Sequence, residues 1–232
     1  MEKFFIDAFL NMPEEEKENF YKSVFLNMEG EYAAKKRIEY YRGKLKHLGN
    51  NVYIGCNVTI KNPQFISISD NVNISDHCTL IATGEKGIVL GQGVRLKYGV
   101  YLDGEGPEGY IHIGKNVYIG TGCCLHGHKG LEIGDDCLLS QNITITPYSH
   151  KFDDLKKPIY TQGGYSRKIT IGKDCYIGKN VCILYSADIG EGSVIGAGSV
   201  VVRRVPPYSV AVGNPAKVIR KRGFPHKNRE KE

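Results

Sequence analysis

Three histidines lie where their side chains could take part in proton transfer, since an imidazole can take or give a proton near neutral pH. His150 ends the stretch TITPYSH, which directly precedes the irregular residues 151–170. His126 and His128 belong to the sequence LHGHKG, earlier in the chain. Cys124 lies two residues before His126, so a nucleophilic thiol is a further hypothesis beside the plainer interpretation of a small hydrophobic side chain.

The elements that must hold these side chains follow a period of six residues. Each unit opens with an aliphatic residue, and a small residue stands four positions later, as in IGKNVYIGTGCC. Three consecutive units form a triplet, and the opening positions of these units hold Ile, Leu or Val. An amphipathic helix requires apolar residues three and four apart, which a period of six does not supply. The triplets begin at Leu48, Ile68, Leu90, Ile113, Ile133, Ile171 and Ile189.

The spacing between triplets shows where the chain can bulge outward. Extra residues fall only after the third unit of a triplet, and the longest insertion follows the unit 145–150. This is typical of a solenoid with three short faces per turn, in which a loop leaves one corner without disturbing the stack. We therefore predict an all-β solenoid of about seven three-sided coils over residues 48–205, with the loop 151–170 projecting from one corner. His150 is then the last residue of a rigid corner, a favoured place for function.

The chain before residue 48 predicts helices. Pro13 is followed by three acids, as expected at a helix start, and Gly30 ends the first segment. A second helix is predicted over residues 31–46. The segment 1–47 could cap the open end of the first coil, or could also cover or select an acceptor molecule. Apolar residues at helical spacing in the first helix are Phe20, Tyr21, Val24, Phe25 and Met28.

Composition and charge indicate the class of protein. The chain is 41% hydrophobic, has no apolar run near the roughly 20 residues that cross a bilayer, and begins with an acidic stretch unlike a signal peptide, so we expect a cytoplasmic protein. The seven cysteines lack CxxC pairs and predict reduced thiols. The net charge of +6 is concentrated in the tail 206–232, which is either a solvated end or an anion-binding segment. No nucleic-acid-binding motif is present. Four cysteines occupy the small position and are expected to be buried: Cys78, Cys123, Cys137 and Cys175.

The repeat, the interruption after His150 and the ending VIGAGSVVVRRVPPYSVAVGNPAKVIRKR together resemble the hexapeptide-repeat acyltransferases over about residues 48 to 222. Within that family the chain is similar to bacterial sugar O-acetyltransferases of the galactoside, maltose and exopolysaccharide type. The resemblance implies a left-handed parallel β-helix. The period itself does not show the hand, since strand crossovers are normally right-handed.

The resemblance also implies an activity. Acetyl-CoA would donate an acetyl group directly to a hydroxyl of a sugar or polysaccharide precursor, with His150 as the general base and no metal. The family is trimeric, which implies a homotrimer with sites between subunits. Acetylation of an antibiotic of the chloramphenicol or streptogramin type, or N-acetylation of an amino sugar, is the alternative. A non-enzymatic β-solenoid is a second alternative, and so is a zinc site of the gamma-type carbonic anhydrase kind at His126, His128 and His150.

Further site residues follow from the same resemblance. The sequence departs from the galactoside type at Gly120, where that type has an acceptor-binding Asn, and at Tyr176, where Trp is frequent. Acceptor recognition should therefore differ from that type, with Asp154 as a further candidate group. The expected acceptor-binding residues are His126, His128, Asn142, Asp153 and Tyr176. The expected cofactor-binding residues are Gly178, Gly196, Ala197, Gly198, Ser199, Arg203, Lys217 and Arg220.

Overall fold

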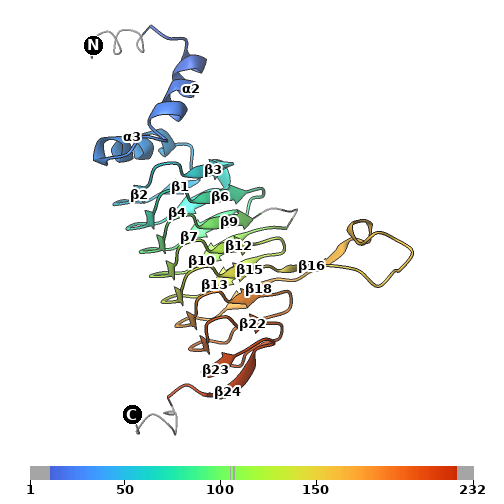
Figure 1. Ribbon diagram of the computed structural model, residues 1–232. Helices are drawn as coiled ribbons and strands as arrows, with labels where there is room; N and C mark the ends of the chain where they lie inside the picture. The colour runs from blue at the N-terminus through green and yellow to red at the C-terminus, as the bar shows by residue number, and fades with distance from the viewer. Residues whose placement is uncertain (1–10, 105, 107, 224–232) are drawn as a thin grey trace.

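The structure is a computed structural model that describes residues 11–104, 106 and 108–223. Figure 1 shows a column of stacked coils, with helices α2 (Glu14–Val24) and α3 (Glu31–Tyr41) at one end and strand β24 (Lys217–Lys221) at the other. The predicted β-solenoid of about seven turns is confirmed. The left hand of the coil, which the resemblance implies, stays a prediction. No helix within the described ranges is long and apolar enough to span a membrane.

The sides of the column are three sheets, here named A, B and C, and each of the first six coils adds one short strand to each sheet. Sheet A contains β1 (His47–Leu48), β4 (Ile66–Ile68), β7 (Ile88–Leu90), β10 (Ile111–Ile113), β13 (Leu131–Ile133) and β18 (Ile169–Ile171). Sheet B contains β2 (Tyr53–Ile54), β5 (Asn73–Ile74), β8 (Arg95–Leu96), β11 (Tyr118–Ile119), β14 (Leu138–Leu139), β19 (Tyr176–Ile177), β21 (Val194–Ile195), β23 (Ser209–Val212) and β24. Sheet C contains β3 (Thr59–Lys61), β6 (Thr79–Ala82), β9 (Tyr101–Gly104), β12 (Cys124–His126), β15 (Thr144–Ile145), β20 (Cys182–Ile183) and β22 (Val200–Val201).

The register of the parallel strands confirms the predicted period. The aliphatic residues that open the triplets pair with one another from coil to coil along sheet A, from Leu48 with Ile68 to Ile133 with Ile171. A bridge then joins Ile171 to Ile189, and another joins Ile189 to Val205. Because each opening position faces the axis, the coils share one continuous apolar core.

The small positions of the repeat are buried in the same core. The four cysteines predicted to be buried are at most 2% exposed. Burial raises the pKa of the Cys78 thiol, and that of Cys123, to about 11, so both are protonated near neutral pH. These cysteines are therefore packing residues, as the sequence predicted.

The glycine that follows many opening positions is required by the closeness of the coils. A Cβ atom added at Gly178 would lie 2.6 Å from the backbone nitrogen of Ala197 in the next coil. A Cβ at Gly120 would overlap the carbonyl oxygen of Ser140. Gly120, which the sequence analysis noted as a departure from the galactoside type, is therefore fixed by stacking in this chain.

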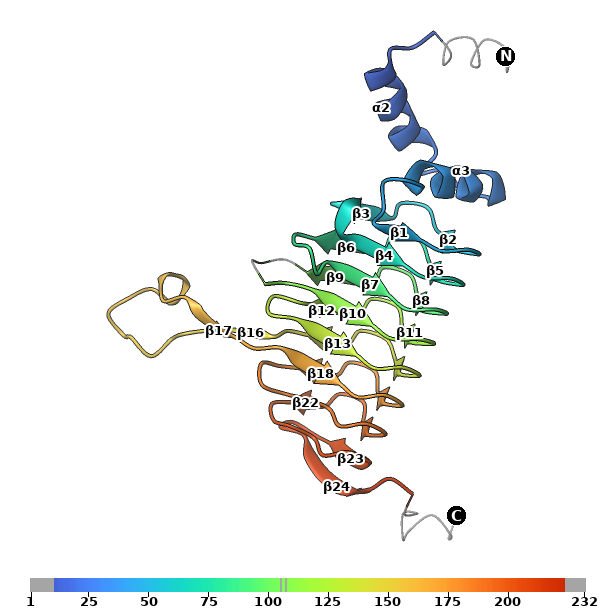
Figure 2. The same cartoon turned by 180° about the vertical axis from the view of Figure 1, so that it is seen from behind.

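Both predicted N-terminal helices occur, although α3 ends at Tyr41 and not at residue 46, and α3 lies across the end of the first coil (Figure 2). Ala33 and Ala34 on α3 are buried, and Arg37 is only 1% exposed. The Arg37 guanidinium donates hydrogen bonds to the carbonyl oxygens of Ile54 in the first coil (2.8 Å) and Met28 before α3 (2.6 Å). Helix α2 has no buried residue, so α3 provides the closure of this end.

The segment 206–223 continues the column, although the sequence analysis separated 206–232 as a tail. Strand β23 pairs in parallel with β21, and β24 folds back antiparallel on β23. Arg222, which follows β24, forms an ion pair with Asp174 (2.7 Å). Residues 224–232 lie outside the described residues.

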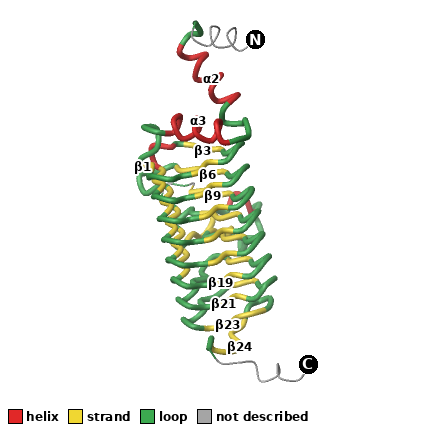
Figure 3. The backbone as a smooth tube through the Cα atoms, turned by 90° about the vertical axis from the view of Figure 1, so that its left-hand side faces the viewer, coloured by secondary structure: helices red, strands yellow, loops and turns green. Residues whose placement is uncertain are grey.

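The long interruption forms a hairpin that leaves the column. Strand β16 (Tyr148–His150) pairs antiparallel with β17 (Gly164–Ser166), and His150 lies opposite Gly164. Residues beyond His150 form the tip, including the short 3-10 helix η2 (Ile159–Thr161). The predicted projection of this loop from the column is plain in Figure 1, and Figure 3 shows the regular stack from another side.

Candidate functional site

His150 is exposed at the base of the projecting hairpin, where the chain leaves the solenoid. The preceding strand, β15, is held in sheet C by parallel pairing to β12 and β20. The ring of Tyr148 meets the His150 ring edge to face, with centroids 4.9 Å apart and an interplanar angle of 86°. The imidazole therefore stands on a rigid support and remains open to solvent.

A row of aromatic and imidazole rings leads from His150 along the corner to sheet C. His128 stacks on Tyr148 at 5.6 Å, His126 lies 5.6 Å from His128, and Tyr101 lies 5.9 Å from His126. These rings come from three successive coils. The three histidines singled out in the sequence thus do lie along one surface.

Asp103 is a buried carboxylate at the far end of this row. It is 5% exposed, and its Oδ2 lies 3.5 Å from Nδ1 of His126 and accepts a hydrogen bond from the Tyr101 hydroxyl at 3.2 Å. The 3.5 Å distance is long for a hydrogen bond, so the contact with His126 is chiefly electrostatic. A carboxylate beside Nδ1 favours a proton on that nitrogen.

The two histidines before His150 have different surroundings. Nε2 of His126 lies 3.3 Å from the Cys124 sulfur, so both nitrogens of this ring face groups of the chain itself. Nδ1 of His128 and Nδ1 of His126 are both buried, and neither has a hydrogen-bond partner among the described residues. Of the pair, His128 lies nearer His150 in the row of rings, since it stacks on Tyr148.

The other predicted acceptor residues are dispersed. Asn142 is at the turn before β15, at the opposite end of that strand from the hairpin, and its backbone is left-handed with φ of 56°. Asp153 is exposed near the start of the hairpin loop, while the Asp154 carboxylate accepts a hydrogen bond from the backbone of Lys156. Tyr176 lies on sheet B, 44% exposed. Sheet B is the side of the column that faces away from the hairpin corner (Figure 1).

The predicted cofactor residues gather in the last coils. Gly196 would place a Cβ 2.6 Å from Val212, and Gly198 adopts a left-handed turn with φ of 70°. The buried Ser199 hydroxyl donates to the Gly196 carbonyl (2.6 Å) and accepts from the backbone of Gly213 (3.0 Å). Close packing and backbone geometry therefore account for the residue types at these positions without a ligand. Gly178 and Ala197 are the stacked pair described above.

The predicted phosphate-binding cations lie on the same end of the column. Arg203 follows β22 and is exposed, and Lys217 begins β24. The backbone nitrogen of Ala216 donates to Val200 at 2.8 Å, which brings Lys217 to the coil that carries Arg203. Arg220 is half-buried on β24, opposite Val210.

Sequence reasoning did not select Tyr101, Asp103 or Tyr148, although the sequence carried a signal for one of them. Leu102 and Leu125 each open the third six-residue unit of their triplets. The residues that follow them must therefore be neighbours on sheet C. Asp103 indeed pairs with His126 in the register. The ring contacts of Tyr101 and Tyr148 depend on side-chain directions, which the period does not give.

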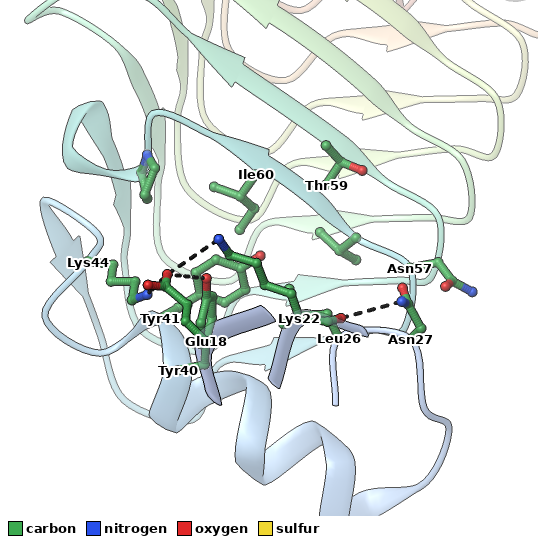
Figure 4. Close-up of a pocket in the computed structure, with 12 residues that line it drawn as sticks. Glu18, Lys22, Leu26, Asn27, Tyr40, Tyr41, Lys44, Asn57, Thr59 and Ile60 are labelled. Carbon is green, nitrogen blue, oxygen red and sulfur yellow. Dashed lines mark hydrogen bonds and ion pairs between the residues drawn. The ribbon is translucent and has the colours of Figure 1, made fainter. Parts of the chain in front are cut away.

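A separate pocket of about 660 Å³ lies at the opposite end, between the N-terminal helices and the first coil (Figure 4). Glu18 pairs there with Lys44 (2.8 Å) and Lys22 (3.4 Å), and Lys44 stands over the ring of Tyr40. The hydrogen bond and charge of Lys44 lower the pKa of Glu18. None of the predicted site residues lines this pocket.

Within residues 11–104, 106 and 108–223, no three His, Cys, Asp or Glu side chains are grouped so that they could hold a metal ion. The zinc alternative required His126, His128 and His150 to converge on one point. The ring contacts instead arrange them in a row, with Tyr148 between His128 and His150.

Two family models match the chain on either side of the hairpin. The model described as hexapeptide repeat of succinyl-transferase matches residues 110–147, and the model described as bacterial transferase hexapeptide (six repeats) matches residues 168–203. Both matches lie in the regular coils, and the hairpin occupies the gap between them.

Curated relatives with similar sequences are acetyltransferases by name. The chain is 37% identical over 115 residues to a probable acetyltransferase of Mycobacterium tuberculosis, an alignment that covers 50% of this chain and 38% of the relative. It is 40% identical over 111 residues to the galactoside O-acetyltransferase of Escherichia coli, covering 47% of this chain and 53% of that enzyme. The chain thus spans about half or less of the length of these two relatives.

A solved structure matches over more of the fold. It is a variant of an N-acyltransferase from Bacillus cereus in complex with dTDP and coenzyme A, with a TM-score of 0.58 and 25% sequence identity, covering 79% of this chain and 88% of that one. The class that the coils and these matches define is the hexapeptide-repeat β-solenoid. More narrowly, the chain is similar to hexapeptide-repeat acetyltransferases, and the resemblance found in the sequence is confirmed.

Proposed function

We propose that this protein is an acetyl-CoA-dependent acetyltransferase that acts on a hydroxyl group of a sugar or polysaccharide precursor. The observation that carries the proposal is the position of His150. Its imidazole is exposed at the base of the hairpin, on the edge of a row of rings, in a chain whose named relatives are acetyltransferases. The named galactoside O-acetyltransferase supports a carbohydrate acceptor.

In this proposal His150 is a general base. A sugar hydroxyl is too weak an acid to ionise near neutral pH, so the imidazole takes its proton as the oxygen attacks the thioester carbonyl. The bond between the carbonyl carbon and the CoA sulfur then breaks, and the imidazolium returns the proton to the departing sulfur. The edge-to-face contact with Tyr148 keeps the ring aimed outward, toward an acceptor.

The acetyl donor is proposed to bind along the last coils. The structural neighbour was solved in complex with coenzyme A, which supports a CoA thioester as the acetyl donor. The exposed Arg203 and Lys217 provide positive charge for the nucleotide phosphates of CoA. The pantetheine arm would follow the stacked turns that contain Gly178 and Gly196 to Ser199, where Ala197 and Gly198 are exposed.

Two separated groups of residues support a homotrimer with shared sites. Tyr176 lies on sheet B and His150 lies at the corner opposite that sheet, so within one chain they cannot contact the same acceptor. A second copy whose sheet B lies against the hairpin corner would bring them together. The hairpin tip also exposes Phe152 (63%), Leu155 (96%) and Tyr160 (82%), which association would cover. Light scattering at micromolar concentration should give the mass of a trimer, and a monomer mass would contradict this arrangement.

An amine acceptor is the second candidate. The solved structure with a TM-score of 0.58 is named an N-acyltransferase and holds dTDP. An amino sugar would place its nitrogen where the proposed hydroxyl stands, and His150 could take its proton in the same way.

The experiment that tests the proposed function is an acceptor screen. The purified protein is incubated with acetyl-CoA and sugars, amino sugars, or chloramphenicol- and streptogramin-type antibiotics, and the release of free thiol is followed. We expect release that depends on a sugar hydroxyl acceptor and an acetyl ester in the product. Release only with amino sugars would favour the second candidate, and acceptor-independent background in every case would contradict both.

A further inference from the structure

Cys124, His126 and Asp103 form a line of three groups on the outer side of sheet C. The Cys124 sulfur is 3.3 Å from Nε2 of His126, and Nδ1 of the same ring is 3.5 Å from the Asp103 carboxylate. The order thiol, imidazole, carboxylate is that of a nucleophile, its base and the group that orients the base. The proton transfer assigned to His150 uses none of these three groups.

Two adjacent strands hold the line in place. On β12, Cys124 and His126 are two residues apart and share the outer face, while Leu125 between them is fully buried. Strand β9 places Asp103 directly opposite His126 in the parallel register. The Tyr101 hydroxyl donates to the Asp103 carboxylate at 3.2 Å, so this end of the line is anchored as well.

We propose that Cys124 is a second reactive centre of this protein, which takes the acetyl group of an acetyl thioester with His126 as its base. His126 Nε2 removes the thiol proton as the sulfur attacks the carbonyl carbon. The bond from that carbon to the donor sulfur breaks, and the imidazolium gives its proton to the departing thiolate. One thioester replaces another, so no oxidant or reductant is required. The choice of acetyl-CoA as the natural donor rests on the proposed function.

The surroundings of the thiol explain why it needs a base. Burial raises the pKa of Cys124, and the negative charge of Asp103 raises it further, so the resting group is a thiol and not a thiolate. Such a thiol is a poor nucleophile unless its proton is removed during the attack. His126 lies within reach for that step, and contacts of this kind commonly tighten when a substrate binds.

The chain contains a matched control for this thiol. Cys182 lies in the same outward row of sheet C, since Cys124 pairs with Thr144 and Thr144 pairs with Cys182. Both cysteines are partly exposed. Leu184 lies two residues after Cys182, at the position that corresponds to His126 after Cys124. The two sites therefore share the scaffold and differ in the imidazole.

The test uses the full-length protein without any acceptor. It is incubated with acetyl-CoA or, in parallel, with S-acetyl-N-acetylcysteamine, a small thioester that needs no nucleotide site. Acetylated peptides are mapped by mass spectrometry, and their lability to hydroxylamine identifies thioesters. We expect Cys124 to be acetylated at least about tenfold faster than Cys182 with both donors, since general bases contribute such factors. His126→Phe, which keeps a ring in the row, should lower the rate at Cys124 to that at Cys182.

Failure of this inference is distinguishable from failure of the proposed function. If acetyl-CoA is not the donor, the small thioester still labels Cys124 ahead of Cys182. If His150 is the transfer base, His150→Ala slows transfer to acceptors by roughly a hundredfold to ten-thousandfold and leaves the labelling of Cys124 intact. Equal labelling of Cys124 and Cys182 by the small thioester would overturn the inference. So would an unchanged rate in a folded His126→Phe protein or, should that variant not fold, in Asp103→Asn.

Discussion

The two faces of strand β12 show how this protein separates stability from chemistry. The inward residue Leu125 pairs with Leu102 and Ile145 on neighbouring strands, and all three are fully buried. The outward residues Cys124 and His126 face side chains that change from coil to coil. The inner face buries aliphatic side chains at equivalent positions along the whole column, whereas the residue types on the outer face vary. Function should therefore be sought where the outer row departs from the pattern.

The largest expected effect is the loss of an inner side chain. Leu125→Ala should lower the free energy of unfolding by about 2–5 kcal/mol, because it removes buried methyl groups and leaves a cavity between coils. Denaturant unfolding followed by circular dichroism would measure this change. Thr144→Ala, an outward substitution on the next strand, should cost less than about 1 kcal/mol. Equal costs for the two variants would remove the distinction between the faces.

The next effect concerns the glycines that allow close stacking. Gly120→Ala should lower the free energy of unfolding by about 1–3 kcal/mol, because the added methyl group would overlap the Ser140 carbonyl oxygen of the next coil. Gly84→Ala is the control, since no atom lies within 4 Å of a Cβ at that position. The same unfolding measurement should show little change for the control. A stable Gly120→Ala protein would mean that the coils separate more easily than we infer.

A smaller effect is expected from the ring that supports His150. Tyr148→Leu should reduce turnover about tenfold and leave the Michaelis constant for acetyl-CoA unchanged, because the imidazole loses its edge-to-face contact. Tyr148→Phe keeps the ring and should retain nearly full turnover. Steady-state kinetics with a confirmed acceptor would measure both. A Leu variant as active as the Phe variant would show that Tyr148 does not position the base.

The smallest effect is a pH dependence that comes from the inner cysteines. The folded protein holds the pKa of Cys78 and Cys123 at about 11, against an ordinary value of 9.0. Because folding favours the protonated thiols, this stability is fully present below pH 9 and declines as pH rises toward 11. At pH 9 each of these two thiols should lower the free energy of unfolding by about 0.4 kcal/mol relative to pH 7. Cys78→Val should remove about 0.4 kcal/mol of that dependence in unfolding experiments at the two pH values, and an unaltered dependence would contradict the assignment.

The regular part of the fold was predictable because one physical requirement repeats. Each coil must bury an aliphatic side chain at the same place, so Leu48, Ile133 and Ile189 could be aligned from sequence and are in register in the structure. The antiparallel return of β24 and the pairing of His150 with Gly164 were not foreseen, since these strands lie outside the repeat. Long-range pairing without a period has no comparable signal in a single sequence.

The candidate site was predictable in part for the same reason. His150 could be selected because the pattern stops there. Tyr148 was missed because its importance depends on the direction of its ring, and Tyr176 could not be placed on the side of the column away from the hairpin until the coil was folded. Sequence alone thus located the corner but not the neighbours that orient its imidazole.

The most direct test of the account is the turnover of His150→Ala with a confirmed acceptor, measured together with its thermal unfolding and its binding of acetyl-CoA. His150 is exposed at a corner and takes no part in the inner core. We therefore predict an unfolding midpoint and acetyl-CoA affinity close to those of the unmodified protein, with turnover lower by roughly a hundredfold to ten-thousandfold. His47→Ala, which removes an exposed histidine from the first coil, should leave all three unchanged. Full turnover by the His150→Ala protein would contradict the assignment of His150 as the general base.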